Sequence, residues 1–240
     1  MAGTYYPGKS FSVAAIMPAA GSGVRMGGAL SKQFLDLGGK PILAVTLDTF
    51  ENCPAVQEIF PVVPPKDVEF CRKEIIEPFG YNKVRKVVPG GRTRQESVRL
   101  GLEATEGGFD YILIHDGVRP FVSIELIEKS IQMAEKYGAA ISALPAKETL
   151  KEINELGEVV MTIDRNNIWL VQTPQVFKYE DIVRAHRRAV EENFLDSTDD
   201  SLLVERLGVK VSVIEGSEDN IKITSPQDLE LAGFILGRRK

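Results

Sequence analysis

The chain has 240 residues and a net charge of −5, with 43% hydrophobic and 26% charged residues. This length is enough for one large α/β domain or two small ones, and the apolar content supports a buried core. The negative balance argues against a protein that coats nucleic acid or lies on a membrane surface, and no apolar run is long enough to span a bilayer. The start of the chain, residues 1–10, lacks the apolar stretch of a signal peptide. Because Cys53 and Cys71 have no metal-like spacing, we expect free thiols and a cytoplasmic location.

The first predicted strand, residues 11–17, runs into a loop of small residues that reads P-A-A-G-S-G-V-R-M-G over residues 18–27. A strand that ends in such a loop exposes backbone N–H groups, and the lack of bulky side chains lets a phosphate approach them closely. Arg25 and Lys32 supply the positive charge that a polyphosphate needs. We therefore predict that this loop wraps the triphosphate of a nucleotide.

Two other phosphate-binding motifs do not fit this loop. A Walker A loop needs Gly-Lys-Ser/Thr after a four-residue gap, but Ala29 follows Gly28 here. The dinucleotide fingerprint needs a third glycine where Met26 stands, which disfavours an NAD-dependent enzyme. A non-catalytic nucleotide-binding domain and a plain glycine-rich turn both stay open as alternatives.

Strand-like and helix-like segments alternate along the chain, which predicts a mostly parallel sheet covered by helices. The run 111–114 has almost no polar side chain, so we place it at the centre of the sheet. Thr93 and Glu96 form a capping-box pattern that begins a helix. The other predicted strands are 56–63, 84–88, 139–144, 209–214 and 221–223, and the predicted helices are 41–50, 68–79, 93–105, 124–134, 179–193, 198–207 and one that begins at Pro226.

The pattern changes after Pro145. Two alternating segments, 149–153 and 159–163, are joined by Asn-Glu-Leu-Gly, which predicts a β-hairpin. An isolated hairpin is marginal in water, so this one should pack on another surface, either as a lid or as an arm on a second subunit. We expect a single domain over 1–240 with a Rossmann-like three-layer α/β fold, from which the hairpin protrudes as an arm at about 146–171.

Two carboxylates are placed to act on a nucleotide. His115-Asp116 directly follows the predicted central strand, and ligands of open α/β sheets bind beyond the carboxyl ends of the strands. Asp116 could hold a divalent cation or cap the next turn, and His115 could orient a neighbour or simply pack. Asp219 lies beside Lys222 between two late predicted strands, a combination that suits a Mg²⁺ ion bound to a triphosphate but also an ordinary polar turn.

Other charged residues receive structural interpretations. Arg119, three residues after Asp116, is interpreted as a structural arginine near the site. The acidic residues that precede the apolar stripe of 198–207 are interpreted as helix N-terminal charges. These acids are Asp196, Asp199 and Asp200.

The chain resembles the 2-C-methyl-D-erythritol 4-phosphate cytidylyltransferase family in four motifs that occur in order from about Ser12 to the last helix. The motifs are P-A-A-G-S-G-V-R-M-G…S-K-Q-F, H-D-G-V-R-P, D-R-N-N-I-W…T-P-Q-V-F and E-G-S-E-D-N-I-K-I-T. The resemblance implies an enzyme of non-mevalonate isoprenoid synthesis that joins CTP to methylerythritol phosphate and releases pyrophosphate. H-D-x-V-R-P is also similar to ribitol-5-phosphate cytidylyltransferases, whereas E-G-x-x-D-N-I-K is closer to the methylerythritol phosphate family.

The resemblance implies a role for each residue that matches a motif. Arg25 and Lys32 would stabilise charge at the α-phosphate, and Gly91 and Ser97 would recognise the cytosine. Lys222 would help to position the phosphate of the acceptor. The implied catalytic residues are Arg25, Lys32, Arg165 and Lys222, the implied nucleotide-binding residues are Ala19, Ala20, Gly21, Ser22, Gly23, Gly91, Ser97 and Asp116, and the implied substrate-binding residues are Thr149, Arg165, Thr173 and Lys222.

The resemblance also implies a metal ion and a second subunit. Asp116 and Asp219 would hold Mg²⁺ or another divalent cation. The hairpin would be an arm exchanged in a homodimer, and its Thr149 and Arg165 would reach the polyol phosphate bound by the partner subunit. Two positions depart from the family pattern. Arg92 stands where some members carry an acid beside the base pocket, and Gly117-Val118 replaces a more usual pair of alanines.

Overall fold

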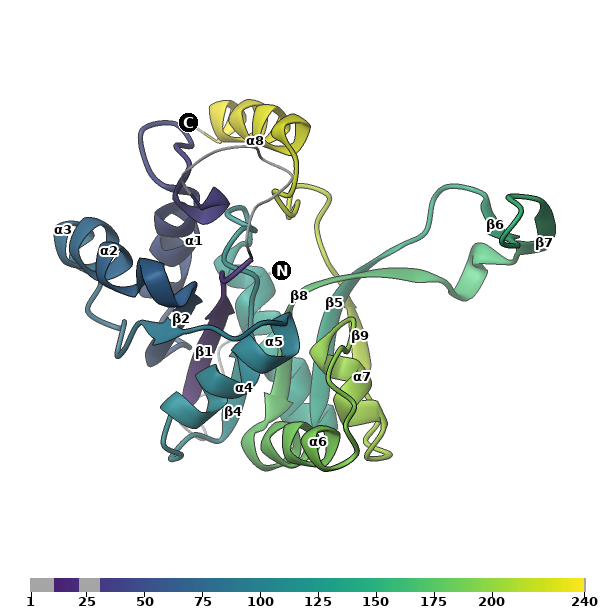
Figure 1. Cartoon of the computed structure of the whole chain (residues 1–240), viewed down its shortest axis with the longest axis horizontal. Helices are drawn as coiled ribbons and strands as arrows, with labels where there is room; N and C mark the ends of the chain where they lie inside the picture. Colours follow the sequence, from purple (N-terminus) through teal and green to yellow (C-terminus); the bar gives the residue numbers. More distant parts are fainter. Residues whose placement is uncertain (1–10, 22–30, 240) are drawn as a thin grey trace, which may run out of the picture.

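The structure is a computed structural model that describes residues 11–21 and 31–239. One sheet organises its body (Figure 1). In spatial order the seven strands are β3 (Val88–Pro89), β2 (Glu58–Val63), β1 (Val13–Pro18), β4 (Tyr111–Ile114), β8 (Trp169–Lys178), β5 (Ala139–Pro145) and β9 (Ser212–Glu215). Neighbouring strands pair in parallel, except that β8 is antiparallel to both β4 and β5. The predicted mostly parallel sheet is confirmed, and β4 lies at its centre as expected.

Helices cover both faces of the sheet because side chains alternate along each strand. In β1, Val13 and Ala15 belong to one buried cluster, while Ala14 and Ile16 belong to the other. The first cluster packs on α1 (Ile42–Glu51), on α2 (Val68–Cys71) and the π-helical turn (Arg72–Ile76) that leads into α3 (Glu77–Phe79), and on α5 (Ile124–Tyr137). The second cluster packs on α4 (Arg94–Ala104), α6 (Tyr179–Glu191) and α7 (Asp200–Glu205). The three-layer α/β prediction is therefore confirmed. In the part of the chain that is described, no helix has the length and apolar run needed to cross a bilayer.

The last helix, α8 (Pro226–Arg238), closes the body beyond the carboxyl ends of the strands (Figure 1). Its Ala232 and Ile235 pack against Val118 and Phe121 in a third buried cluster. A capping box begins the helix: the hydroxyl of Ser225 accepts the N–H of Asp228, and the carboxylate of Asp228 accepts the N–H of Ser225. This cap anchors the segment that carries Lys222.

The sequence predicts no strand between 171 and 179, yet β8 lies there, between β4 and β5. Pro174 stands in the middle of β8, and proline is unusual inside a central strand, which weakens the sequence signal. The prediction of a strand at 221–223 is wrong, because this segment is irregular. The strand expected at 84–88 shrinks to β3 and one isolated bridge between Ile59 and Val84.

The predicted hairpin is present as a second, two-stranded sheet of β6 (Leu150–Ile153) and β7 (Val159–Ile163), which protrudes from the body (Figure 1). The side chain of Asn154 accepts the N–H groups of Leu156 and Glu158 and so shapes the turn. Apolar side chains on this arm are exposed: Leu156 is 82% and Val159 is 60% accessible. Within one chain, these side chains bury little of their surface.

Candidate functional site

The loops of the site leave from one edge of the sheet. Strands β1, β3 and β4 end at this edge and continue into the loops 19–21, 90–93 and 115–119. Because β8 runs in the opposite direction, Thr173 in its first half reaches the same edge. The loop that follows β9 adds Lys222. Ligands of open α/β sheets bind at this position.

Small residues let these loops approach one another closely. A Cβ on Gly117 would lie 2.9 Å from the Cβ of Ala19, and a Cβ on Gly90 would overlap that of Ala20. The N–H of Gly117 also donates to the carbonyl of Pro18 over 3.0 Å. Glycine at 117, where the family pattern has alanine, therefore has a local packing reason: alanine here would require its neighbours to shift.

A cavity of about 440 Å³, the first cavity, lies over this edge. Four cations in its described lining, Lys32, Arg92, Arg94 and Lys222, face a single carboxylate, that of Asp116. The lining is thus locally basic although the chain is acidic overall.

Most of the predicted nucleotide-binding residues meet in the first cavity. Arg92, which departs from the family pattern, has a side chain that is 92% exposed, and its backbone N–H donates to Glu96. Three predicted residues, Ser22, Gly23 and Arg25, lie outside the described residues. The predicted residues that the structure brings together in this lining are Ala19, Ala20, Gly21, Lys32, Gly91, Ser97, Asp116 and Lys222.

Lys32 is held beside the small-residue loop. It begins a short 3-10 turn, Lys32–Phe34, and the hydroxyl of the preceding Ser31 donates to Asp67 over 2.6 Å. A Cβ built on Gly21 would lie 3.7 Å from the Cε of Lys32, so the lysine side chain passes close to this glycine. Its ammonium group therefore stands near the backbone at the end of β1.

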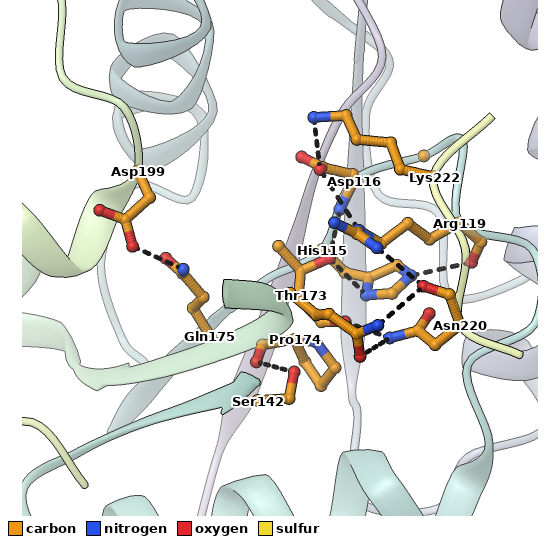
Figure 2. Close-up of polar contacts among 12 residues, drawn as sticks. His115, Asp116, Arg119, Ser142, Thr173, Pro174, Gln175, Asp199, Asn220 and Lys222 are labelled. Carbon is orange, nitrogen blue, oxygen red and sulfur yellow. Dashed lines mark hydrogen bonds and ion pairs between the residues drawn. The ribbon is translucent and has the colours of Figure 1, made fainter. Parts of the chain in front are cut away.

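Asp116 is a buried anion among cations; its ion pairs with Lys222 and Arg119 are seen in Figure 2. The Nζ of Lys222 lies 2.8 Å from Oδ2, the Nε of Arg94 lies 3.2 Å from Oδ1, and the Nε of Arg119 lies 3.6 Å from Oδ2. Burial by itself raises the pKa of Asp116, but Arg94, Lys222 and Arg119 together outweigh burial and hold this pKa well below its usual value. The carboxylate is therefore ionised at neutral pH.

Arg94 joins Asp116 to a second buried carboxylate. Its Nη1 donates to Asp200 over 2.6 Å, and the Nε2 of His186 lies 3.3 Å from the other oxygen of Asp200. The interpretation of Asp200 as a helix N-terminal charge therefore misses its main contact, whereas Asp199 does cap α7 by accepting the N–H of Leu202. Sequence reasoning did not single out Arg94; the one available signal is its position at the start of a helix directly after a glycine-rich turn.

A second cavity of about 380 Å³ shares Arg94, Asp116 and Lys222 with the first. It is also lined by Thr173, one of the predicted substrate-binding residues, and by Arg119. Arg119 was interpreted as structural, yet it contacts Asp116 and faces this cavity. The two cavities thus meet at a shared group of charged side chains.

Thr173 sits between Asp116 and His115 (Figure 2). Its Oγ accepts the N–H of Asp116 over 3.1 Å and lies 3.0 Å from the Nδ1 of His115. The Nε2 of His115 lies 3.0 Å from the carbonyl oxygen of Arg119. Burial lowers the pKa of His115 to about 4, so the imidazole is neutral at physiological pH.

Asn220 ties the last loop to β8. Its Nδ2 donates to the backbone carbonyl of Thr173 over 2.7 Å, and its backbone carbonyl accepts from the Nη1 of Arg119 over 2.7 Å (Figure 2). The Nε2 of Gln172 donates to the carbonyl of Ser217 in the same loop. These bonds hold the chain just before Lys222.

Three of the predicted site residues that the structure describes do not line either cavity of the same chain. The side chain of Asp219 is 50% exposed, and it lies 3.9 Å from that of Arg239. Thr149 and Arg165 are exposed residues of the arm, and Arg165 donates to the carbonyl of Lys147. The structure therefore does not bring Asp219 into the lining that contains Asp116.

The described residues alone form no metal cage, since no group of three or more His, Cys, Asp or Glu side chains among them could hold an ion. Mg²⁺ is usually held by one or two carboxylates together with phosphate oxygens and water. A carboxylate offers about four acceptor positions, and three cations contact that of Asp116. The residues therefore fit an ion that a bound polyphosphate would hold for the most part, and Asp116 would be its protein ligand.

This fold and its locally basic cavity define an α/β protein that binds a phosphorylated ligand at the carboxyl edge of its sheet. The family described as IspD, 2-C-methyl-D-erythritol 4-phosphate cytidylyltransferase, matches residues 13–238. The chain belongs to this family and is a cytidylyltransferase, an enzyme of the nucleotidyltransferase class. The resemblance inferred from the four motifs is confirmed.

Relatives and solved structures agree with this assignment. Proteins named 2-C-methyl-D-erythritol 4-phosphate cytidylyltransferase from Geobacter metallireducens and Geotalea uraniireducens are 48% and 49% identical over 224 and 226 residues, which is 92% and 93% of this chain and 96% of each relative. The crystal structure of 4-diphosphocytidyl-2C-methyl-D-erythritol synthase from Anaerococcus prevotii has a TM-score of 0.84 at 35% identity and covers 96% of this chain and 100% of its own. Neither a non-catalytic nucleotide-binding domain nor a ribitol phosphate enzyme is favoured by these findings.

Proposed function

We propose that this chain transfers the cytidylyl group of CTP to 2-C-methyl-D-erythritol 4-phosphate and releases pyrophosphate, a step of non-mevalonate isoprenoid synthesis. The observation that carries the proposal is the pair of cavities that share Lys222, Arg94 and Asp116. The first cavity, with Lys32 beside the end of β1, suits the triphosphate. The second, with Arg119 and Thr173, suits the polyol phosphate.

The chemistry follows from charge. The acceptor phosphate is already an anionic nucleophile, so its attack on the α-phosphorus needs no general base. A bond forms between an acceptor phosphate oxygen and the α-phosphorus, the bond from the α-phosphorus to the bridging oxygen breaks, and pyrophosphate leaves with the electron pair. The obstacle is the repulsion between two anions, so positioning and cationic stabilisation supply most of the catalysis. Lys32 would neutralise charge on the triphosphate, and Lys222, at the junction of the cavities, would hold the attacking phosphate.

A divalent cation, Mg²⁺ by preference, would enter with CTP and offset the negative charge of the triphosphate. Asp116 is the protein group we propose for it, because Arg94 is the only cation among the described residues that contacts its Oδ1. Asp219 was predicted to share this role, but its exposed position beside Arg239 gives the proposal no support.

Base selection is proposed for the turn at 91–97. The hydroxyl of Ser97 donates to the carbonyl of Thr93 over 2.9 Å and accepts the N–H of Gly91 over 3.1 Å. Its proton is therefore used within the turn, and only a lone pair remains for a ligand. A lone pair suits the exocyclic amino group of cytosine and repels the corresponding carbonyl of uracil. These hydrogen bonds of Ser97 support a preference for CTP over UTP.

We also propose that the chain works as a homodimer through its arm. The arm exposes Leu156, Val159 and Met161, and exposed apolar groups of this kind mark an interaction surface. Thr149 and Arg165 lie on the same arm, outside the cavities of their own chain. In the dimer each arm would bring these two residues to the polyol phosphate of the partner subunit.

The cytoplasm is the proposed location. Cys53 and Cys71 are both buried and free, as is usual in a reducing compartment. Burial raises the pKa of both thiols, which keeps them protonated and unreactive.

Phosphorus NMR tests the proposed reaction. Wild-type enzyme with CTP, Mg²⁺ and methylerythritol phosphate should convert the signals of both substrates into those of inorganic pyrophosphate and of a diphosphate diester. The variant Lys222→Ala should form the same product much more slowly. Release of inorganic monophosphate without a diester would show hydrolysis of CTP instead of transfer and would contradict the proposal.

A further inference from the structure

The hydroxyl of Thr173 has two partners whose chemistry sets the position of its proton. The N–H of Asp116 can only donate, so at this contact, 3.1 Å long, the Thr173 oxygen accepts. The other partner, the Nδ1 of His115 at 3.0 Å, donates or accepts according to the tautomer of the imidazole. The direction of the second bond therefore depends on His115.

The tautomer of His115 follows from its other nitrogen. Nε2 lies 3.0 Å from the carbonyl oxygen of Arg119, and a carbonyl oxygen can only accept. Nε2 therefore carries the proton. The side chain of His115 is fully buried, and no carboxylate of the described residues bonds to it, so the ring is neutral and its Nδ1 is a bare acceptor. Thr173 must then donate its hydroxyl proton to Nδ1.

We propose that His115 is a positioning residue that fixes the direction of this hydrogen-bond chain, so that Thr173 presents only a lone pair to the molecule in the second cavity. The chain runs from His115 to the Arg119 carbonyl at one end and from the Asp116 N–H to Thr173 at the other (Figure 2). This inference rests on the proposed function, because it takes the polyol phosphate as the occupant of that cavity.

The consequence is a rule for what Thr173 binds. A phosphate dianion offers only acceptor oxygens, so it cannot bond to a hydroxyl whose proton is already committed. A hydroxyl group of the polyol can donate to the remaining lone pair. Thr173 therefore recognises a hydroxyl of the acceptor, and the cations Lys222 and Arg119 on the same lining recognise its phosphate. These two separate contacts distinguish the polyol phosphate from a phosphate ester that lacks this hydroxyl.

Kinetics with deoxy acceptors test this inference. The quantity to measure is the ratio of kcat/KM for methylerythritol phosphate to that for each of its monodeoxy analogues. One analogue should be poorer by about fivefold or more in the wild-type enzyme, the effect of one lost hydrogen bond. Thr173→Val should reduce the ratio for that analogue to about one, since the partner of the missing hydroxyl is gone. KM for CTP should stay unchanged.

The variants of His115 separate positioning from packing. His115→Phe keeps a ring next to Phe50, whose centroid lies 5.1 Å from that of His115, but it removes both nitrogens. Thr173 can then rotate its proton, so the ratio should also fall toward one. His115→Gln keeps a donor for the Arg119 carbonyl and serves the same purpose if the phenylalanine variant does not fold. His115→Asn places an amide oxygen near the site of Nδ1 and should restore most of the ratio.

Ser142→Ala is the matched control. Its hydroxyl donates to the carbonyl of Pro174 over 2.9 Å, so the variant loses a buried bond to the same segment without touching the Thr173 hydroxyl (Figure 2). Its ratio should equal that of the wild type. The inference is overturned if the His115 variants slow all acceptors equally and keep the ratio, or if Thr173→Val keeps it. If wild-type enzyme does not use methylerythritol phosphate at all, the proposed function itself fails, which is a different result.

Discussion

The Nζ of Lys222 lies 2.8 Å from the Oδ2 of Asp116, and this contact joins the loop after β9 to the loop after β4. In the sheet, β8 and β5 separate these two strands, so the loops must bend over its edge to meet. The side chain of Lys222 is 38% exposed, whereas that of Asp116 is 6% exposed. The carboxylate thus holds a cation that is still accessible from the cavity.

Replacement of Lys32 tests the role of that cation in transfer. Lys32→Ala should lower kcat about a hundredfold at saturating CTP, because loss of one contact to developing charge costs about 3 kcal/mol. Lys86→Ala is the control: it removes an exposed lysine that lines neither cavity, and it should keep the wild-type rate. Steady-state pyrophosphate release measures both. Wild-type turnover in Lys32→Ala would remove this residue from the mechanism.

Replacement of Asp200 tests the buried ion pair with Arg94. Asp200→Asn leaves the guanidinium of Arg94 short of one buried carboxylate, so the free energy of unfolding should fall by about 3 kcal/mol in urea titrations. The matched change Asp196→Asn alters an exposed acid in the same segment and should cost less than about 0.5 kcal/mol. Equal stability of the two variants would show that the pair contributes nothing.

The same pair predicts a dependence of stability on pH. Burial raises the pKa of Asp200, but Arg94 and His186 outweigh it and leave the folded pKa below its usual value. The unfolded chain therefore takes up a proton here at a higher pH than the folded chain, near pH 4, and stability is lost as the pH falls below that point. In Asp200→Asn this part of the acid-induced loss should be absent. The slope of the unfolding free energy against pH should be measured for both proteins between about pH 5 and pH 3, around the usual aspartate pKa. Identical slopes in the wild type and in Asp200→Asn would contradict the assignment.

Replacement of Ser97 tests base selection. Ser97→Ala removes the lone pair that we assign to the amino group of cytosine, so the preference for CTP over UTP in kcat/KM should fall by about fivefold. Ser130→Ala also removes a buried helical hydroxyl, one that donates to the carbonyl of Leu126, and it should keep the preference. An unchanged preference in Ser97→Ala would place base selection elsewhere.

Mixing two inactive variants tests the exchanged arm. Lys222→Ala disables the body of one chain, and Arg165→Ala disables its arm. If each site combines the body of one chain with the arm of the other, half of a randomly mixed population is heterodimer with one intact site, which gives about a quarter of wild-type activity. If body and arm act within the same chain, every site in the mixture carries a defect, and no activity should return.

The sequence predicts most of the local structure because this structure depends on short-range patterns. The apolar run 111–114 and the Asn154 turn of the arm lie where they were expected, since burial and turn chemistry are encoded within a few residues. Strand β8 could not be found in this way. Pro174 interrupts its pattern, and its place between β4 and β5 depends on long-range pairing.

The site is predictable only where residues follow strands directly. Asp116 was found because it follows the most apolar strand. The partnership of Arg94 with Asp116 and Asp200 was not, because it joins segments distant in the sequence. Asp219 is predicted because it lies beside Lys222 in a family motif, but its neighbour Asn220 is the residue that turns inward and is fully buried. Adjacent residues of an irregular loop point in different directions, and the sequence carries no period that distinguishes them.

The most direct test of the central claim is pyrophosphate release measured with each of the four common nucleoside triphosphates and with two acceptors, methylerythritol phosphate and ribitol phosphate, in the presence of Mg²⁺. We expect the cation-lined pair of cavities to give rapid release only with CTP and methylerythritol phosphate together. Equal release with ribitol phosphate, or tight binding of CTP with no release for either acceptor, would contradict it.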